Sequence, residues 1–168
     1  MQILDRKKIL TPFNAFHSSF SFDDDGDFIF SAGVSGAYGV LLKEEINIDY
    51  KYLLGILDSS LLEKYLKIIS TALRGSYYSF ENKYIKQLPI RTIDFSNPAE
   101  KAQHDKLVAL VDNMLELQKK YHETRMERDK ELYERQIKIV DAQIDRLVYD
   151  LYGLTEEEIK VVEESGGR

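Results

Sequence analysis

The side chains best suited to chemistry gather between residues 74 and 91. Arg74 and Gly75 lead into the run from Ser76 to Phe80, so a guanidinium, hydroxyl groups and aromatic rings lie close together in the chain. Such groups can donate hydrogen bonds and stack on nucleobases, and the lysines that follow can contact phosphates. The candidate binding residues are Arg74, Ser76, Tyr77, Tyr78, Lys83, Lys86 and Arg91.

The same segment also has a purely structural interpretation. The rings of Tyr77, Tyr78 and Phe80 could form a core beneath a turn, and Arg74 could cover them with the aliphatic part of its side chain. The residue types alone leave both interpretations open.

The distribution of charge matters more than its total. The formal net charge of −6 argues against nucleic-acid binding, because phosphate contacts require lysine and arginine. Residues 61–94, however, carry six basic and three acidic residues, whereas the segments before and after them are both acidic. We therefore expect a local basic footprint on an acidic scaffold.

Catalytic and metal-binding patterns are not legible in the sequence. Cysteine is absent, and His17, His104 and His122 are far apart, which disfavours a metal triad. The acidic run Asp23–Asp27 lacks the later glutamate of a calcium loop and is better explained as a hairpin turn. Neither a nucleophile elbow nor a P-D…D/E-x-K nuclease pattern occurs. We predict no catalytic residue and no metal ligand.

The glycine-rich segment 31–39 raises the question of a nucleotide cofactor. It has neither the Gly-Lys-Ser/Thr sequence of a P-loop nor the G-x-G-x-x-G spacing of dinucleotide folds. We interpret it as a loop or bulge between strands and predict no cofactor.

Length and composition indicate a soluble globular chain. Its 168 residues suffice for one ordinary domain with a core and leave room for an added helical element, and the hydrophobic content of 43% disfavours disorder. No apolar run approaches a membrane span, and the first residues lack the apolar core of a signal peptide. We expect a cytoplasmic location and no membrane contact.

Several elements are expected to position the candidate residues. Phenylalanines alternating with polar residues predict two strands between Phe13 and Phe30, joined by the acidic turn. Asp49 should cap a helix that ends near residue 58, and Ser60 should open the next helix through an S-x-x-E capping box. The apolar face of that second helix runs to Leu73, before Gly75. Residues 82–87 should be helical or turn-like, residues 88–90 extended, and residues 90–93 a short strand that places Arg91 in the same neighbourhood.

The C-terminal part has the pattern of a helical hairpin. Asn97-Pro98 predicts a helix start, Gly153 a helix end, and Thr155 a capping box for a short last helix. Heptad-like apolar positions run along both long helices: Leu107, Leu110, Val111, Met114, Leu117 and Tyr121, then Tyr133, Ile137, Val140, Ile144, Leu147 and Leu151. The charged segment 122–130 between them predicts a chain reversal, with one uninterrupted helix as the alternative.

These elements define an α+β fold class: a small mixed sheet with a helix pair, then a C-terminal antiparallel helical hairpin. The predicted domains are residues 1–95, an α+β recognition-like domain, and residues 96–168, the hairpin with a short terminal helix.

Three segments resemble a known family. YLLGILDSSLLEKYLKIIS, LRGSYYSFENKYIKQLPI and QIDRLVYDLYGLTEEEI look like the C-terminal specificity region of TaqI-like N6-adenine DNA methyltransferases and of fused restriction-modification enzymes. The resemblance runs from about Phe20 to about Val162. The glycine-rich segment also looks like the family's loop ahead of the first helix, where the backbone could approach DNA closely.

The resemblance implies a non-catalytic target recognition domain for double-stranded DNA. It implies a methyltransferase or nuclease catalytic domain as partner, in cis or in trans, since the family's Asn/Asp-Pro-Pro-Phe/Tyr segment and cofactor loop are absent from this sequence. Lys83 and Lys86 would contact phosphates, Arg74 or Arg91 a base edge, and Tyr77 and Tyr78 would stack or donate hydroxyl hydrogen bonds. The rival hypothesis is a protein-interaction or oligomerisation module that uses the hairpin without nucleic acid; a nuclease with scattered carboxylates is a third.

Overall fold

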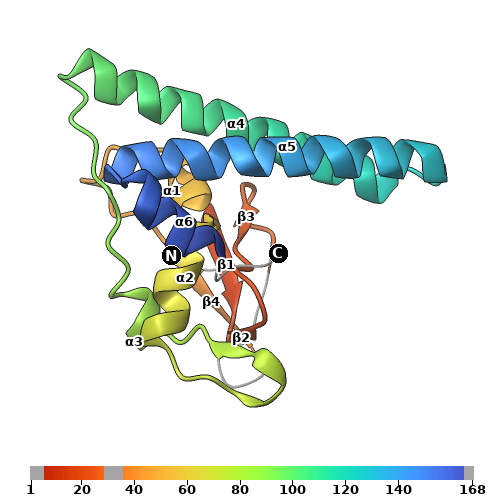
Figure 1. The fold of residues 1–168 in the computed structure, drawn as a ribbon, viewed down its shortest axis with the longest axis horizontal. Coiled ribbons are helices and arrows are strands. Elements are labelled where there is room, and N and C mark those ends of the chain that lie inside the picture. The colour runs from red at the N-terminus through yellow and green to blue at the C-terminus, as the bar shows by residue number, and fades with distance from the viewer. Residues whose placement is uncertain (1–5, 29–35, 165–168) are drawn as a thin grey trace.

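The computed structural model describes residues 6–28 and 36–164 and has the predicted α+β architecture (Figure 1). The strands are β1 (Lys8–Pro12), β2 (Asn14–Ala15), β3 (Ser21–Asp23), β4 (Ala37–Val40) and β5 (Tyr78–Ser79). The helices are α1 (Tyr50–Leu57), α2 (Ser60–Ile69), the 3₁₀ turn η2 (Arg74–Ser76), α3 (Asn82–Ile85), α4 (Pro98–Glu123), α5 (Glu127–Tyr152) and α6 (Glu156–Glu164).

The described strands form two small antiparallel sheets, where the sequence suggested one mixed sheet. β1 lies between β3 and β4, with Ile9 opposite both Phe22 and Val40. The second sheet pairs β2 with β5, and Ala15 stands opposite Tyr78. The strand predicted to reach Phe30 and most of the glycine-rich segment lie outside the described residues.

The sequence did not predict β5, nor β4, which covers residues 37–39 of the segment interpreted as a loop or bulge. It also did not predict β1, whose charged first residue hides the apolar pattern. Lys8 is fully buried and forms an ion pair with Asp23 across the β1–β3 pair. Asp23 also organises the predicted acidic turn, since its carboxylate accepts hydrogen bonds from the amides of Gly26, Asp27 and Phe28 at 3.0–3.2 Å. A turn is therefore present at the acidic run, whereas the predicted pairing of the strands on either side of it involves residues outside the described ones, and β3 pairs with β1.

The predicted helix pair is present, with one corrected boundary. The side chain of Asp49 caps α1 by accepting a hydrogen bond from the amide of Lys51, as expected. The cap of α2 is Ser59, whose hydroxyl accepts from the amide of Leu62, so the prediction of Ser60 as cap was wrong by one residue. α2 also ends earlier than predicted, because Ser70 has an extended backbone.

The antiparallel helical hairpin is confirmed, with the chain reversal at Thr124–Met126 (Figure 1). Asn97 caps α4, and Pro98 occupies its first turn. Gly153 ends α5 with φ of 67°. Thr155 and Glu158 form the predicted reciprocal capping box before α6: each backbone amide donates to the other's side chain.

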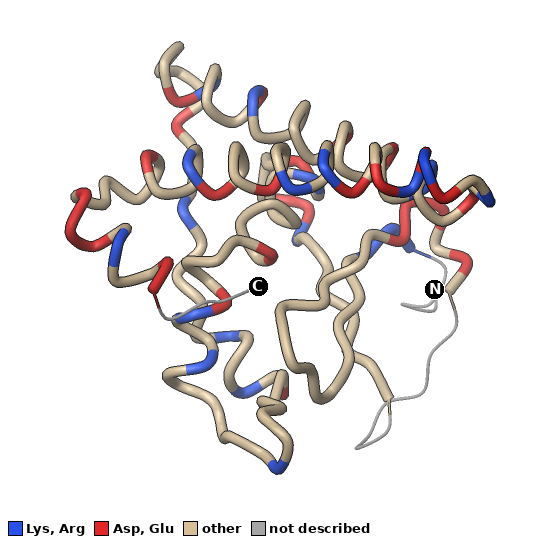
Figure 2. The backbone as a smooth tube through the Cα atoms, turned by 45° about the vertical axis from the view of Figure 1, so that its right-hand side comes forward, with Lys and Arg blue, Asp and Glu red and all other residues tan. Residues whose placement is uncertain are grey.

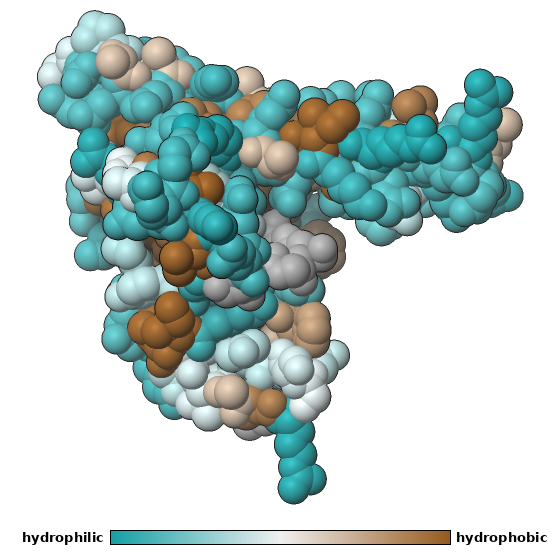
Figure 3. Space-filling view, viewed as in Figure 1, coloured by the Kyte–Doolittle hydropathy of each residue, from teal (hydrophilic) through white to brown (hydrophobic). Residues whose placement is uncertain are grey.

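One hydrophobic core joins the helix pair to the hairpin. It contains Leu54 and Leu57 of α1, Leu107 and Val111 of α4, and Val140 of α5. The heptad-like seam therefore packs inside the molecule over much of its length. The far end of the hairpin, where α4 and α5 join, projects beyond the rest of the chain (Figures 1 and 3). Among the described residues, no helix combines the length and the apolar character needed to cross a bilayer.

Candidate nucleic-acid interface

Residues Thr71–Ser79 form a short hairpin, here called the finger, at the end of the molecule away from α4 and α5 (Figure 1). The amide of Leu73 donates to the carbonyl of Tyr77 at 2.7 Å, and the amide of Ser79 donates to the carbonyl of Thr71 at 3.0 Å. Ala72 and Tyr78 form an antiparallel bridge between these two bonds. The finger thus has the cross-section of a two-stranded β-ribbon.

The tip of the finger is the turn Arg74-Gly75-Ser76. Gly75 and Ser76 have φ values of 75° and 63°, so the chain turns through two successive left-handed conformations. A side chain at Gly75 would find open space apart from the ring of Tyr77, 3.8 Å away, and glycine is therefore required here by backbone conformation alone. All three tip residues are exposed, and Arg74 is the first of them.

The base of the finger is fixed to the body. β5 pairs with β2, and the amide of Phe80 donates to the carbonyl of Phe13 at 2.8 Å. The hydroxyl of Thr71 lies 2.5 Å from that of Tyr84, which links the finger to α3. A finger anchored in this way presents its tip in a defined orientation.

The two interpretations of the aromatic run each describe part of it. Phe80 is fully buried and Tyr78 packs on the core, as the structural interpretation required. Tyr77, in contrast, leaves 48% of its surface exposed, and Arg74 and Ser76 are exposed beside it. The tip, rather than the whole run, is therefore free to contact a ligand.

Lys83 lies in the short helix α3, which is confirmed where a helix or turn was predicted, and Lys86 is the residue at its C-terminal end. Lys83 pairs with Glu81 at 3.1 Å and lies 4.8 Å from the ring centroid of Tyr84. The hydrogen bond from Lys83, with a second from Ser79, lowers the pKa of Glu81, and the same bond raises the pKa of Lys83. Lys86 is exposed. Figure 2 shows these basic positions with those of α2 and the finger tip at one end of the molecule.

Arg91 lies in a different environment from the finger. Its guanidinium is 3.5 Å from Glu100 of α4. Its backbone amide donates to the hydroxyl of Tyr152, and its carbonyl accepts from that of Tyr52. Residues 90–93 form no strand, so that prediction was wrong, and the contacts of Arg91 join it to the helices. Burial raises the pKa of both tyrosine hydroxyls.

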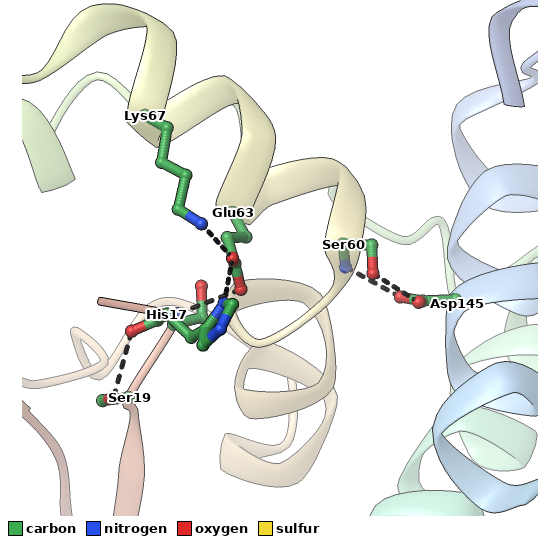
Figure 4. Close-up of polar contacts among 7 residues, drawn as sticks. His17, Ser19, Ser60, Glu63, Lys67 and Asp145 are labelled. Atoms are coloured by element: carbon green, nitrogen blue, oxygen red, sulfur yellow. Dashed lines mark hydrogen bonds and ion pairs between the residues drawn. The ribbon is translucent and has the colours of Figure 1, made fainter. Parts of the chain in front are cut away.

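A polar cluster beside the finger was missed by sequence reasoning (Figure 4). Its centre is the buried carboxylate of Glu63, which was expected to cap its own helix. Glu63 instead accepts from Lys67 at 2.5 Å and from the amide of Ser18 at 3.0 Å, and it lies 2.9 Å from Nδ1 of His17. The i, i+4 spacing of Glu63 and Lys67 was visible in the sequence, but the approach of residues 16–18 was not.

The remaining histidines offer no metal site in the described part of the chain. His104 is buried against the rings of Tyr52 and Phe95, and its Nε2 accepts from the amide of Asp49 at 3.3 Å. No group of three or more His, Asp or Glu side chains suitable for a metal occurs among the described residues. The arrangement of the finger and α3 is suited to binding an extended anionic ligand.

Comparison with known proteins identifies the family. The profile of the TaqI-like C-terminal specificity domain matches residues 1–90, which include the finger, α3 and both sheets. The chain belongs to the family of TaqI-like C-terminal specificity domains. The matched residues end before α4, so the helical hairpin lies outside the matched part of the chain.

One curated relative extends the similarity over more of the chain. The type II restriction enzyme and methyltransferase RM.Eco57I of Escherichia coli is 30% identical over 149 residues. The aligned region covers 86% of this chain but only 15% of the relative's length. The similarity therefore concerns one part of a much larger protein, and it reaches beyond the matched profile.

Proposed function

We propose that this specificity domain recognises double-stranded DNA by placing the finger in the major groove. The observation that carries the proposal is the exposed tip Arg74-Gly75-Ser76 on an anchored two-stranded ribbon, within the basic segment of the chain. The major groove of B-DNA admits a two-stranded β-ribbon, and base edges there can be distinguished by hydrogen bonding. Family membership supports the same assignment.

The position of each candidate suggests its role. Arg74, exposed in the tip, is the residue we assign to a base edge, because a guanidinium can donate two hydrogen bonds to guanine. Lys83 in α3 and Lys86 at its C-terminal end would contact phosphates beside the groove, and Ser76 and Tyr77 would supply hydroxyl or ring contacts. Tyr78 packs on the core at the base of the finger and would hold the finger in place. Arg91, bound to Glu100, is a less favourable base-reading candidate than Arg74.

We further propose that the domain binds DNA but does not catalyse a reaction on it. Its relative is named as both a restriction enzyme and a methyltransferase and is far longer than this chain. We infer that a methyltransferase or nuclease catalytic domain acts together with the domain, in cis or in trans. Purified chain incubated with DNA and a sulfonium methyl donor should transfer no methyl group; transfer above a mock preparation would contradict this proposal.

The test of recognition compares Arg74→Ala with Arg125→Ala, an exposed arginine in the hairpin turn. A preferred duplex is first selected from a randomised pool, and binding is then measured by fluorescence anisotropy. Arg74→Ala should weaken binding to the preferred duplex by about 1–3 kcal/mol and leave other duplexes nearly unaffected. Equal losses on all duplexes would make Arg74 a phosphate contact, and no loss would remove the finger from the interface.

A second function, as a protein-interaction module, is favoured by one observation. The hairpin exposes Met126 at the chain reversal and Leu132 and Ile139 along α5, each with more than half of its surface accessible. If this surface binds a partner or a second copy, Leu132→Ser with Ile139→Ser should abolish the association in light scattering while DNA binding persists. Retained association in the double variant would count against this function.

A further inference from the structure

Phe16 is an exposed aromatic ring that is nevertheless held on several sides. It leaves 46% of its surface accessible. Its ring meets that of His17 edge-on at 4.6 Å between centroids and that of Tyr77 edge-on at 6.2 Å. The ammonium of Lys67 lies 6.0 Å from the ring centroid. An exposed phenylalanine would usually be free to change rotamer, whereas these neighbours restrict the orientation of this one.

The neighbours are themselves fixed by a buried carboxylate. Glu63 binds Lys67 and lies within hydrogen-bonding distance of His17, and it also holds the amide of Ser18, two residues beyond Phe16 (Figure 4). Lys67 additionally lies 5.4 Å from the ring centroid of Tyr78 at the base of the finger. The support of Phe16 therefore connects α2, the segment after β2 and the finger.

The location of this ring points to a nucleobase as its ligand. Tyr77 directly follows the tip residue Ser76, so Phe16 stands at the side of the finger that we place in the groove. Its neighbours Lys67 and Tyr77 belong to the basic segment 61–94, which suits a polyanion rather than an apolar protein surface. A ring that is already oriented loses little conformational entropy when a flat ligand stacks on it.

We propose that Phe16 is a stacking residue whose exposed ring receives a nucleobase of the bound DNA, beside the bases that the finger reads. The proposal rests on the function proposed above. Stacking on an aromatic ring is tolerant of base identity, because every base has a π-face. Phe16 would thus add affinity for an unstacked base, whereas Arg74 would supply sequence discrimination.

The test uses two duplexes that both contain the preferred sequence and are identical except that one carries a single bulged adenine. The quantity of interest is the ratio of their dissociation constants, measured by anisotropy at low salt. The wild-type chain should prefer the bulged duplex, and Phe16→Ala should reduce that preference about tenfold, within the range for loss of one base–aromatic stack. Phe16→Leu keeps the apolar bulk but has no aromatic ring, so it should behave like Phe16→Ala. Phe16→Trp keeps an aromatic ring and should retain the preference for the bulged duplex.

Controls separate this inference from the proposed function. Phe28→Ala removes another exposed phenylalanine, outside the Phe16 cluster, and should leave the ratio unchanged. Arg74→Ala should weaken binding to both duplexes and preserve the ratio. If Phe16→Ala and Phe16→Leu retain the wild-type ratio while Arg74→Ala still weakens binding, only the stacking role is overturned. If the wild-type chain binds neither duplex, both proposals fall.

Discussion

The carboxylate of Asp145 on α5 accepts two hydrogen bonds from Ser60 at the start of α2, one from the amide at 2.8 Å and one from the hydroxyl at 2.6 Å (Figure 4). A negative charge at a helix N-terminus also interacts favourably with the helix dipole. Because α2 carries Glu63 and Lys67, this contact links the support of the proposed DNA surface to the helical hairpin.

Asp145→Ala should therefore lower stability more than removal of an ordinary surface carboxylate. The free energy of unfolding, measured by urea denaturation, is expected to fall by about 1.5–3 kcal/mol, the usual range for hydrogen bonds to a charged group. Asp150→Ala is the matched control on the same helix, since Asp150 is exposed and pairs only at the surface with Arg146 at 3.4 Å. That change should cost less than about 1 kcal/mol. Equal losses of unfolding free energy in the two variants would mean that the hydrogen bonds between Ser60 and Asp145 stabilise the fold no more than a surface ion pair does.

The Ser60 contact also shows where sequence patterns stop being informative. Ser59 and Ser60 are both acceptable caps, and the S-x-x-E pattern selects Ser60. The structure uses Ser59 because Ser60 and Glu63 are engaged by residues distant in sequence, Asp145 and His17. Local patterns could not reveal these partners.

The parts predicted well are those determined by local or periodic signals. The hairpin follows from apolar residues at heptad-like spacing, such as Val140 and Leu147, and from the charged segment between the helices. The finger depends instead on pairing of β5 with Asn14–Ala15, far away in the chain. Of the candidate residues, Arg74 and Ser76 could be placed at an exposed turn from sequence, but the separate position of Arg91 could not.

Gly55 provides a test of the packing between α1 and α4. A methyl group at this position would lie 2.8 Å from Cγ2 of Val111 and 3.0 Å from Cδ1 of Leu107, and both of these side chains are buried. Alanine would favour helix by about 1 kcal/mol, whereas overpacking costs about 1–3 kcal/mol. Gly55→Ala should thus destabilise by up to about 2 kcal/mol in thermal or urea unfolding.

The second half of this test makes room for the added methyl group. In the background of Val111→Ala, the closest clashing atom is absent, so Gly55→Ala should become neutral or stabilising. A double-mutant cycle measures this coupling directly. If Gly55→Ala is equally destabilising in both backgrounds, close approach of α4 is not the reason for glycine at this position.

The pair formed by Lys8 and Asp23 should make stability depend on pH. Burial alone would raise the pKa of Asp23, but the hydrogen bond from Lys8, with those from the amides of Phe28 and Gly26, brings the pKa below its usual value of 3.8. A carboxyl whose pKa is lowered by folding contributes stability that is fully present above the unfolded-state pKa and is lost as the pH falls through the folded-state pKa.

Unfolding of Asp23→Asn and wild type should therefore be compared from pH 7 down to about pH 3.5. At neutral pH the variant removes the Asp23 carboxylate from this buried ion pair and should lose about 3 kcal/mol. The difference in unfolding free energy between the variant and wild type should become smaller below about pH 4. Asp24→Asn, at an exposed position paired with Lys7, should show little difference at any pH. A difference in unfolding free energy between Asp23→Asn and wild type that does not change with pH would contradict the prediction.

The lysines of α3 should contribute to DNA binding through phosphate neutralisation. Because the basic surplus of residues 61–94 is small, the plot of log affinity against log salt should have a slope of about −2 to −4, at about 0.9 per phosphate neutralised. Lys86→Ala and Lys83→Ala should each reduce the magnitude of that slope by about one and weaken binding to all sequences alike. An unchanged slope in both variants would place α3 away from the DNA backbone.

Glu81 should act as a built-in competitor for the phosphate contact of Lys83. Its carboxylate holds the ammonium at 3.1 Å, and this hydrogen bond lowers the pKa of Glu81. Glu81→Gln removes this negative charge and releases Lys83, so we expect tighter DNA binding and a somewhat steeper salt slope. The matched control is Glu134→Gln, which breaks a comparable exposed pair with Lys138 at 2.9 Å on the hairpin and should leave affinity unchanged. If both variants tighten binding equally, the gain reflects overall charge, and Lys83 is not at a phosphate.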